Sequence, residues 1–245
     1  MFLKDNEVSH RAGVTQLVEC DLAKVDVAGS NPVSRSIKIS MKPLLALAFA
    51  LPLLAQDYKL EPISTAAPDL PAAYASAIQA QGYRVTGPKG AWCEVWFRKS
   101  IPTGSKPSDP SIVFPIAQGT LLGVLRFPEQ GADRRGQVIN PGLYTLRYSD
   151  YPVDGAHQGV APQRDFVLLS PIASDPDPNA SPDFETLVKM STKASNAPHP
   201  AVLSLEQPQG GSLPALVKEG DSDWVLNVKV GDITIGLIVV GTAQA

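Results

Sequence analysis

Functional side chains gather in one stretch of this 245-residue chain, from Arg147 to Phe166. The stretch joins two segments with strand-like patterns and is longer than most hairpin loops. Long loops carried by rigid strands are where binding groups collect. We therefore predict a ligand site built from the acidic, amide, imidazole and guanidinium side chains of this stretch: Asp150, Asp154, His157, Gln158, Gln163, Arg164 and Asp165.

Three of these residues suggest specific chemistry. The Arg164 guanidinium can form paired hydrogen bonds with a carboxylate or with sugar hydroxyls. Asp154 and His157 are suited to sharing a metal ion or to acid/base catalysis. The alternative is structural, with Arg164 paired to a nearby acid and the loop covering one end of the fold.

A metal site is the second hypothesis, for copper handling or metal-assisted hydrolysis. It draws on His157, His199, Asp154 and Cys93, of which at least three must converge on one ion. The competing expectation is that Cys93 is a small buried hydrophobe and His199, between two prolines, a turn residue.

Catalytic sequence motifs are absent from the chain. There is no Gly-rich phosphate loop, no Gly-x-Ser-x-Gly and no His-Glu-x-x-His. We predict no cofactor and no catalytic residue, and expect a non-enzymatic protein.

Two further groups of residues have alternative interpretations. Trp92 and Trp96 are predicted to share a strand face, where they form either a sugar-stacking platform or part of the core. The polar stretch from Glu129 to Gln137 is expected to be a solvated turn, with an anion site as the alternative.

The front of the chain predicts export. Residues 41–55 have a basic residue, Lys42, then an apolar run from Leu44 to Leu54 and a small residue, Ala55, as in a signal peptide. The apolar run is too short to span a bilayer, so no membrane span is expected after cleavage. We therefore predict a periplasmic or extracellular protein.

Residues 1–40 have no amphipathic period and are expected to be a disordered leader. Within them, Gly13 to Ser36 resembles a conceptual translation of a transfer-RNA gene, which implies that translation starts at Met41.

Composition restricts the partners. After Ala55 the chain has 15 Lys and Arg against 19 Asp and Glu, and no basic cluster larger than Arg134 and Arg135. Nucleic acid binding needs a concentrated positive field, so it is excluded. The expected partner is a small molecule, a glycan or an envelope protein. Cys93 is the only cysteine after the leader, so no intrachain disulfide can form.

The pattern of elements predicts a mainly β fold. After a Pro/Ala-rich tether at 56–68, residues 69–245 are predicted to form a single antiparallel β-sandwich domain with one or two short helices. The helices are expected within 69–83 and 181–196, the second starting at a Ser181 cap and lying over a sheet. Gly231 and Asp232 predict a type II′ hairpin between two strands.

The runs "RRGQVINPGLYTLRYSDYPVDGAHQGVAPQRDFVLLSP" and "DWVLNVKVGDITIGLIVVG" resemble a family of secreted bacterial proteins without assigned function. They are also distantly similar to β-sandwich domains that carry a P/A-G-x-Y-x-L strand, here Pro141 to Leu146. The resemblance spans Tyr83 to Gly241. It implies a β-sandwich and export, and it supplies no catalytic residues.

Overall fold

The computed structural model describes residues 57–102, 104, 107, 109–152, 163–195 and 197–243. The described residues all belong to one compact unit, Leu53–Ala245. The expected leader and signal peptide lie outside them, as do three of the predicted site residues, Asp154, His157 and Gln158.

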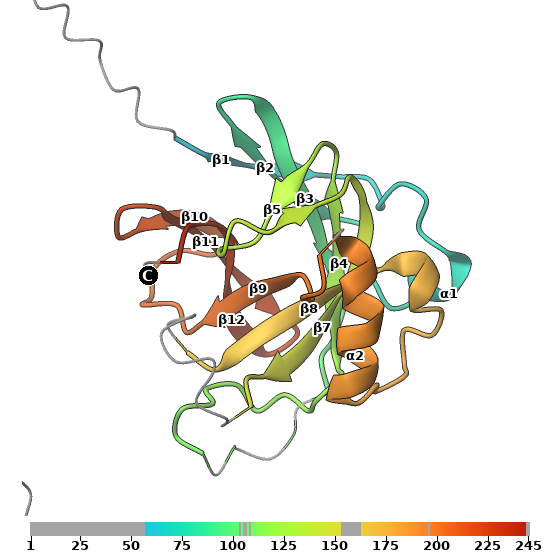
Figure 1. Ribbon diagram of the computed structural model, residues 1–245. Helices are drawn as coiled ribbons and strands as arrows, with labels where there is room; N and C mark the ends of the chain where they lie inside the picture. Colours follow the sequence, from blue (N-terminus) through green and yellow to red (C-terminus); the bar gives the residue numbers. More distant parts are fainter. Residues whose placement is uncertain are drawn as a thin grey trace, which may run out of the picture. The chain divides into compact units, whose positions relative to one another are not determined.

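The fold is mainly β, an antiparallel sandwich in which one long sheet closes almost completely on itself (Figure 1). Its ten strands follow the order β1-β2-β3-β4-β7-β8-β9-β12-β11-β10. The strands of this sheet are β1 (Lys59–Ile63), β2 (Gly82–Gly87), β3 (Gly90–Phe97), β4 (Leu121–Phe127), β7 (Gly142–Asp150), β8 (Asp165–Pro171), β9 (Val202–Glu206), β10 (Ala215–Glu219), β11 (Asp223–Val230) and β12 (Ile233–Val240). A separate two-stranded ribbon is formed by β5 (Gly131–Ala132) and β6 (Val138–Ile139).

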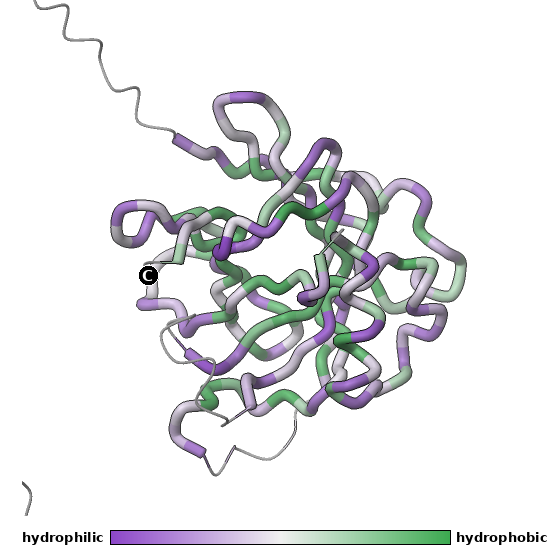
Figure 2. Tube along the Cα trace, in the orientation of Figure 1, coloured by the Kyte–Doolittle hydropathy of each residue, from purple (hydrophilic) through white to green (hydrophobic). Residues whose placement is uncertain are grey.

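The core lies inside the folded sheet. Strand residues alternate between its two faces, and the inward ones form one apolar cluster that includes Val95, Leu146 and Leu237. Figure 2 shows the apolar segments concentrated along the strands and the polar ones in the turns. The two edge strands, β1 and β10, lie beside one another.

The hairpin at the C-terminal end follows the predicted pattern. Strands β11 and β12 pair from Val230 opposite Ile233 outward. Gly231 has φ 59°, which suits the first central position of a type II′ turn. β12 lies between β9 and β11, and its residues Ile235 to Val239 are buried on both faces, as its continuous apolar sequence predicted.

The first helix is shorter than predicted. α1 covers only Ala72–Ala75, and the following residues turn toward the sheet instead of continuing the helix. The amide of Gln79 donates to the Phe97 carbonyl, and the amide of Lys99 donates to the Ala77 carbonyl. These hydrogen bonds to the end of β3 replace the ones that a longer helix would have made. Buried Tyr74 and Ile78 still cover the outer face of β3 and β4.

The second helix lies over the sheet, as predicted, and it covers the outer face of β8 and β9. α2 spans Phe184–Ser191 and packs Leu187 against Phe166 and Leu168. Its cap differs from the prediction, because the Asp183 side chain, and not Ser181, accepts a hydrogen bond from the Thr186 amide. Two short 3-10 helices, η1 (Ile172–Ser174) and η2 (Thr192–Ala194), complete the helical elements of the described residues.

Part of the predicted tether is sheet. β1 lies within residues 56–68 and pairs with β2 along its whole length, from Lys59 opposite Thr86 to Ile63 opposite Gly82. The composition of this segment resembles that of a linker because an edge strand tolerates proline. Pro62 is exposed on β1, which is such an edge strand. Among the described residues, no helix has the length and apolar character needed to cross a membrane.

A buried ion pair fixes the loop after β8. Arg147 on β7 is fully buried, and its guanidinium pairs with both carboxylate oxygens of Asp175 at 2.7 and 2.8 Å. The same guanidinium donates to the carbonyls of Gly119, Asp177 and Ala180. The ion pair therefore stabilises a loop path that apolar packing alone does not determine.

Candidate functional site

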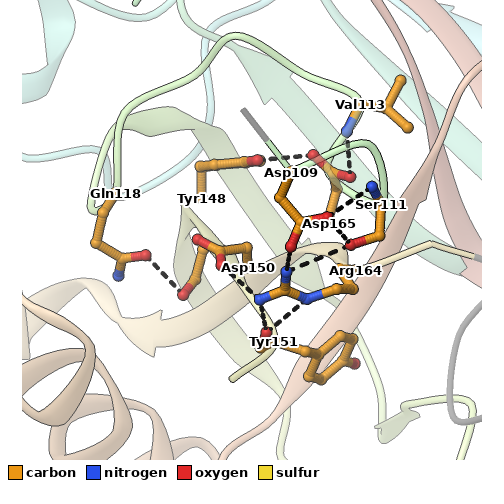
Figure 3. Close-up of polar contacts among 10 residues, drawn as sticks. Asp109, Ser111, Val113, Gln118, Tyr148, Asp150, Tyr151, Arg164 and Asp165 are labelled. Atoms are coloured by element: carbon orange, nitrogen blue, oxygen red, sulfur yellow. Dashed lines mark hydrogen bonds and ion pairs between the residues drawn. The ribbon is translucent and has the colours of Figure 1, made fainter. Parts of the chain in front are cut away.

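Arg164 directly precedes β8, and its guanidinium group is paired with other protein groups (Figure 3). Its guanidinium forms ion pairs with Asp109 and, at 3.0 Å, with Asp150, and Nε donates to the Tyr151 carbonyl at 2.8 Å. Hydrogen bonds from Ser111, and then the Arg164 charge, hold the pKa of the Asp109 carboxyl below its usual range. Arg164 is therefore paired to nearby acids, which is the structural role that the sequence left open as the alternative to ligand binding.

Asp165, the next residue, is fully buried and also has protein partners. Its carboxylate accepts hydrogen bonds from the amides of Val113 and Phe114 at 2.9 and 3.1 Å. It also accepts one from the Tyr148 hydroxyl at 2.6 Å. Burial, and then this carboxylate, raise the pKa of Tyr148. Arg164 and Asp165 together attach the 109–114 segment to the ends of β7 and β8.

The structure thus brings together part of the predicted loop site. Asp150 and Arg164 are in contact, Asp165 is adjacent but faces the interior, and Gln163 accepts a hydrogen bond from the Gln207 amide. The remaining members of the predicted set lie outside the described residues, so the complete site stays a prediction.

The structure separates the described members of the predicted metal set. Cys93 is fully buried in the sandwich core, where burial raises the pKa of its thiol and disfavours the metal-binding thiolate. His199 is exposed in the loop before β9. Within the described ranges, no group of three or more His, Cys, Asp or Glu side chains is arranged to hold a metal ion.

The two tryptophans of β3 do not share a face, which corrects that prediction. A register shift between Val85 and Thr86 on β2 disrupts the alternation at the start of β3. Trp96 is buried on the outer face under the N-terminal segment, and its indole N–H donates to the Thr65 carbonyl. Trp92 packs at the end of the main core and donates to the Val239 carbonyl at 2.8 Å.

A cavity of about 340 Å³ lies beside Trp92, and we call it the head pocket. Its floor is the β2–β3 hairpin turn, and one wall is the ring of Tyr58, which lies directly over Gly87. Any Cβ at Gly87 would lie 2.5 Å from that ring, so only glycine leaves room for it. The Tyr58 and Trp92 rings meet edge to face, with centroids 6.4 Å apart. Together the two rings form an aromatic corner that lines the head pocket beside the β2–β3 turn.

Polar groups border this aromatic corner. Lys89 comes from the hairpin turn, and Glu129 and Gln130 come from the segment after β4. All three are exposed, so they offer one cation, one carboxylate and one amide to a molecule in the pocket. Burial, and then Cys93, raise the pKa of Tyr58, so its hydroxyl stays a neutral hydrogen-bonding group.

The charged side chains in the rest of the Glu129–Gln137 stretch have protein partners. Asp133 is buried and accepts hydrogen bonds from the amides of Arg135 and Gln137 at 2.9 and 3.0 Å. Arg135 pairs with Asp133, and Arg134 pairs with Asp223 at 2.7 Å. Both arginines therefore stabilise the turn.

A second polar cluster joins β9 to β10. Glu206 is only 8% exposed, and its carboxyl lies near the Glu219 carboxyl. Burial, and then Glu219, raise the pKa of Glu206 to about 7. Next to it, the buried Oδ1 of Asn227 has no hydrogen-bond partner among the described residues.

Sequence reasoning missed most of the head pocket. Tyr58 was placed in the tether, and Lys89 was not considered. One usable signal was present: in an antiparallel pair the start of β3 meets the end of β4, which places Gly90 near Glu129. The prediction that Trp92 shares a face with Trp96 hid that proximity.

Comparison with known proteins gave no further guide, because no family model, curated protein or solved structure matches the chain.

Proposed function

We propose that this chain is an exported binding protein, without catalytic activity, that holds a small ligand in the head pocket. The observation that carries the proposal is the pocket itself. Its volume, about 340 Å³, lies in the range of ligand sites, and it combines an aromatic corner with a few polar groups.

The lining suits binding better than catalysis. Tyr58 and Trp92 offer ring surfaces, and Lys89, Glu129 and Gln130 can orient a polar molecule. The described lining has no serine, cysteine or histidine to act as a nucleophile or base. A small polar molecule or a sugar fits these groups.

Export is proposed from residues 41–55 alone. The basic residue, the short apolar run and the small residue at the end are the features that a signal peptidase recognises. Cleavage after Ala55 would leave Tyr58 close to the new N-terminus, at the wall of the pocket.

Native mass spectrometry tests both export and the binding of a small ligand. The chain is expressed from Met1 in a bacterium, and the exported fraction is measured without denaturation. We expect a mass that begins near Gln56 and carries a bound small molecule. A protein that keeps Met1 and stays inside the cell overturns the export proposal.

Matched variants locate the bound molecule. Lys89→Ala and Glu129→Ala should lose most of the bound species, because each removes a polar contact of the pocket. Lys218→Ala and Glu185→Ala change exposed residues away from the pocket and should retain it. Equal retention in all four variants contradicts the proposed site.

A further inference from the structure

A second group of polar side chains lies on the outer face of the sheet, where β9, β12 and β11 are neighbours (Figure 1). Gly236 of β12 is opposite Glu206 of β9 on one side and Asn227 of β11 on the other. The adjacent residues Leu205 and Leu237 point into the core. Residues directly opposite one another on neighbouring strands project to the same face. Glu206 and Asn227 therefore flank Gly236 on the outer face.

Glycine at this position leaves room for the two flanking side chains. A Cβ at Gly236 would lie 2.8 Å from Oδ1 of Asn227 and 3.1 Å from Cγ of Glu206. The amide oxygen and the Glu206 side chain therefore border the same small space. Asn227 is 3% exposed, and its Oδ1 has no hydrogen-bond partner among the described residues. A buried acceptor without a partner is costly, so this oxygen needs a cation or a hydrogen-bond donor.

Acidic groups predominate around this space. The Glu206 carboxyl lies near that of Glu219, at the end of β10. Asp223 is a further acidic neighbour and Arg134 is a basic one, and these two form an ion pair at 2.7 Å. Because that pair is neutral, Glu206 and Glu219 contribute two further negative charges. Two nearby carboxylates are costly to ionise together unless a cation neutralises them.

We propose that Glu206, Glu219 and Asn227 bind a divalent cation, and that Ca²⁺ is the ion that fits best. Carboxylate and amide oxygens are the ligands that Ca²⁺ takes in proteins, in flexible geometry with water completing the set. Mg²⁺ fits less well, because it requires near-ideal octahedral geometry and gives up its waters reluctantly.

This site is distinct from the metal set predicted from the sequence, and it does not depend on the head pocket. Two of its three ligands are acidic and the third is an amide. It therefore differs from a cluster of three or more His, Cys, Asp or Glu side chains, which the described part of the chain lacks.

The ligands come from three strands, β9, β10 and β11. A bound ion therefore links the edge strand β10 to the interior of the sheet. Because only the folded chain brings these ligands together, Ca²⁺ should stabilise the fold in proportion to its binding.

The test is a calorimetric titration of Ca²⁺ into the exported protein, after treatment with EDTA and removal of the chelator. The titration is made at about pH 8, where protons compete little for carboxylates. We expect one ion per chain with a Kd on the order of 0.1–1 mM, as in extracellular Ca²⁺ modules. The unfolding temperature should rise with Ca²⁺ concentration.

Four variants assign the ligands. Glu206→Gln removes a carboxylate and should weaken Ca²⁺ binding by at least about tenfold. Asn227→Leu removes the amide oxygen and should weaken binding similarly, while the Ca²⁺-free protein loses no hydrogen bond and stays folded. Asn227→Asp keeps an oxygen and adds a charge, so it should bind Ca²⁺ at least as tightly as the unchanged protein. Glu185→Gln changes an exposed residue of α2 and should bind normally.

Asn227→Asp also distinguishes an ion site from a structural amide. If Asn227 only donates a hydrogen bond to Glu206, the new carboxylate repels Glu206 and lowers the unfolding temperature with or without Ca²⁺. For an ion site, Ca²⁺ restores that temperature. An unfolding temperature of the unchanged protein that does not respond to Ca²⁺ overturns the proposal. Ca²⁺ binding that persists undiminished in both Glu206→Gln and Asn227→Leu also overturns it.

Discussion

At the scale of single residues, Glu206 makes stability depend on pH. Its pKa is raised from 4.5 to about 7 in the folded state, so the folded chain binds more protons than the unfolded chain between these values. The contribution of Glu206 to stability is therefore fully present below pH 4.5 and is lost as pH rises through about 7. The full shift corresponds to roughly 3 kcal/mol, which solvent screening reduces to about 1–2 kcal/mol.

The measurement is urea unfolding of the protein and of Glu206→Gln across this pH range. Gln cannot titrate, so the difference in unfolding free energy between the two proteins should change by about 1–2 kcal/mol from pH 4.5 to 7.5. Glu185→Gln, an exposed change on α2, serves as the control. A constant difference for Glu206→Gln would show that the pKa of Glu206 is not raised in the folded protein.

Residue types alone could not distinguish binding groups from structural ones in the 150–165 stretch. Arg164 and Asp165 have the chemistry of a ligand site, yet their hydrogen bonds go to Asp109, Tyr151 and the 113–114 backbone. These partners lie 13 to 55 residues away in the sequence, and only the fold brings them together. The identity of Cys93 as a buried hydrophobe was predictable, because it lies in an alternating strand.

At the scale of elements, α2 begins at a different capping residue from the one predicted from the sequence. Asp183 accepts the Thr186 amide at 2.8 Å, although Ser181 precedes the helix with an equally suitable side chain. Asp183→Ala should lower the unfolding free energy by about 1 kcal/mol, the usual value for a lost cap. Ser181→Ala should change it by less than about 0.5 kcal/mol.

Thermal or urea unfolding of the two variants decides between the caps. The reverse ranking, with Ser181→Ala the more destabilising, would place the helix start two residues earlier and contradict the observed cap.

Elements with strong periodicity were predictable, and edge elements were not. The alternation in β11, the hairpin at Gly231 and the continuous apolar sequence of β12 each reflect burial that the sequence must encode. β1 and β10 are edge strands, exposed along one side, so their sequences carry little pattern. Their pairing depends on partners already in place. For that reason the approach of β1 to β10 could not be predicted.

At the scale of the whole sandwich, the head pocket depends on closure of the sheet. The head pocket needs β1 to bring Tyr58 over Gly87, and β1 in turn lies beside β10, the other edge strand. These edge strands are about 150 residues apart in the chain, and only side-chain contacts connect them across the seam. Closure should therefore be the least stable feature of the fold and the easiest to perturb.

Removing the Tyr58 ring tests this dependence. Because the ring contacts both Trp92 and Trp224, Tyr58→Ala should loosen both borders of the seam. Hydrogen exchange over seconds to minutes should accelerate roughly tenfold in Lys59–Ile63 and also in Ala215–Glu219, consistent with the loss of two aromatic pairs. Central β12 should remain protected on this timescale, because its amides open only with the global fold. Val138→Ala, an exposed change on β6, should alter neither edge. Acceleration confined to β1 would show that Tyr58 does not hold β10.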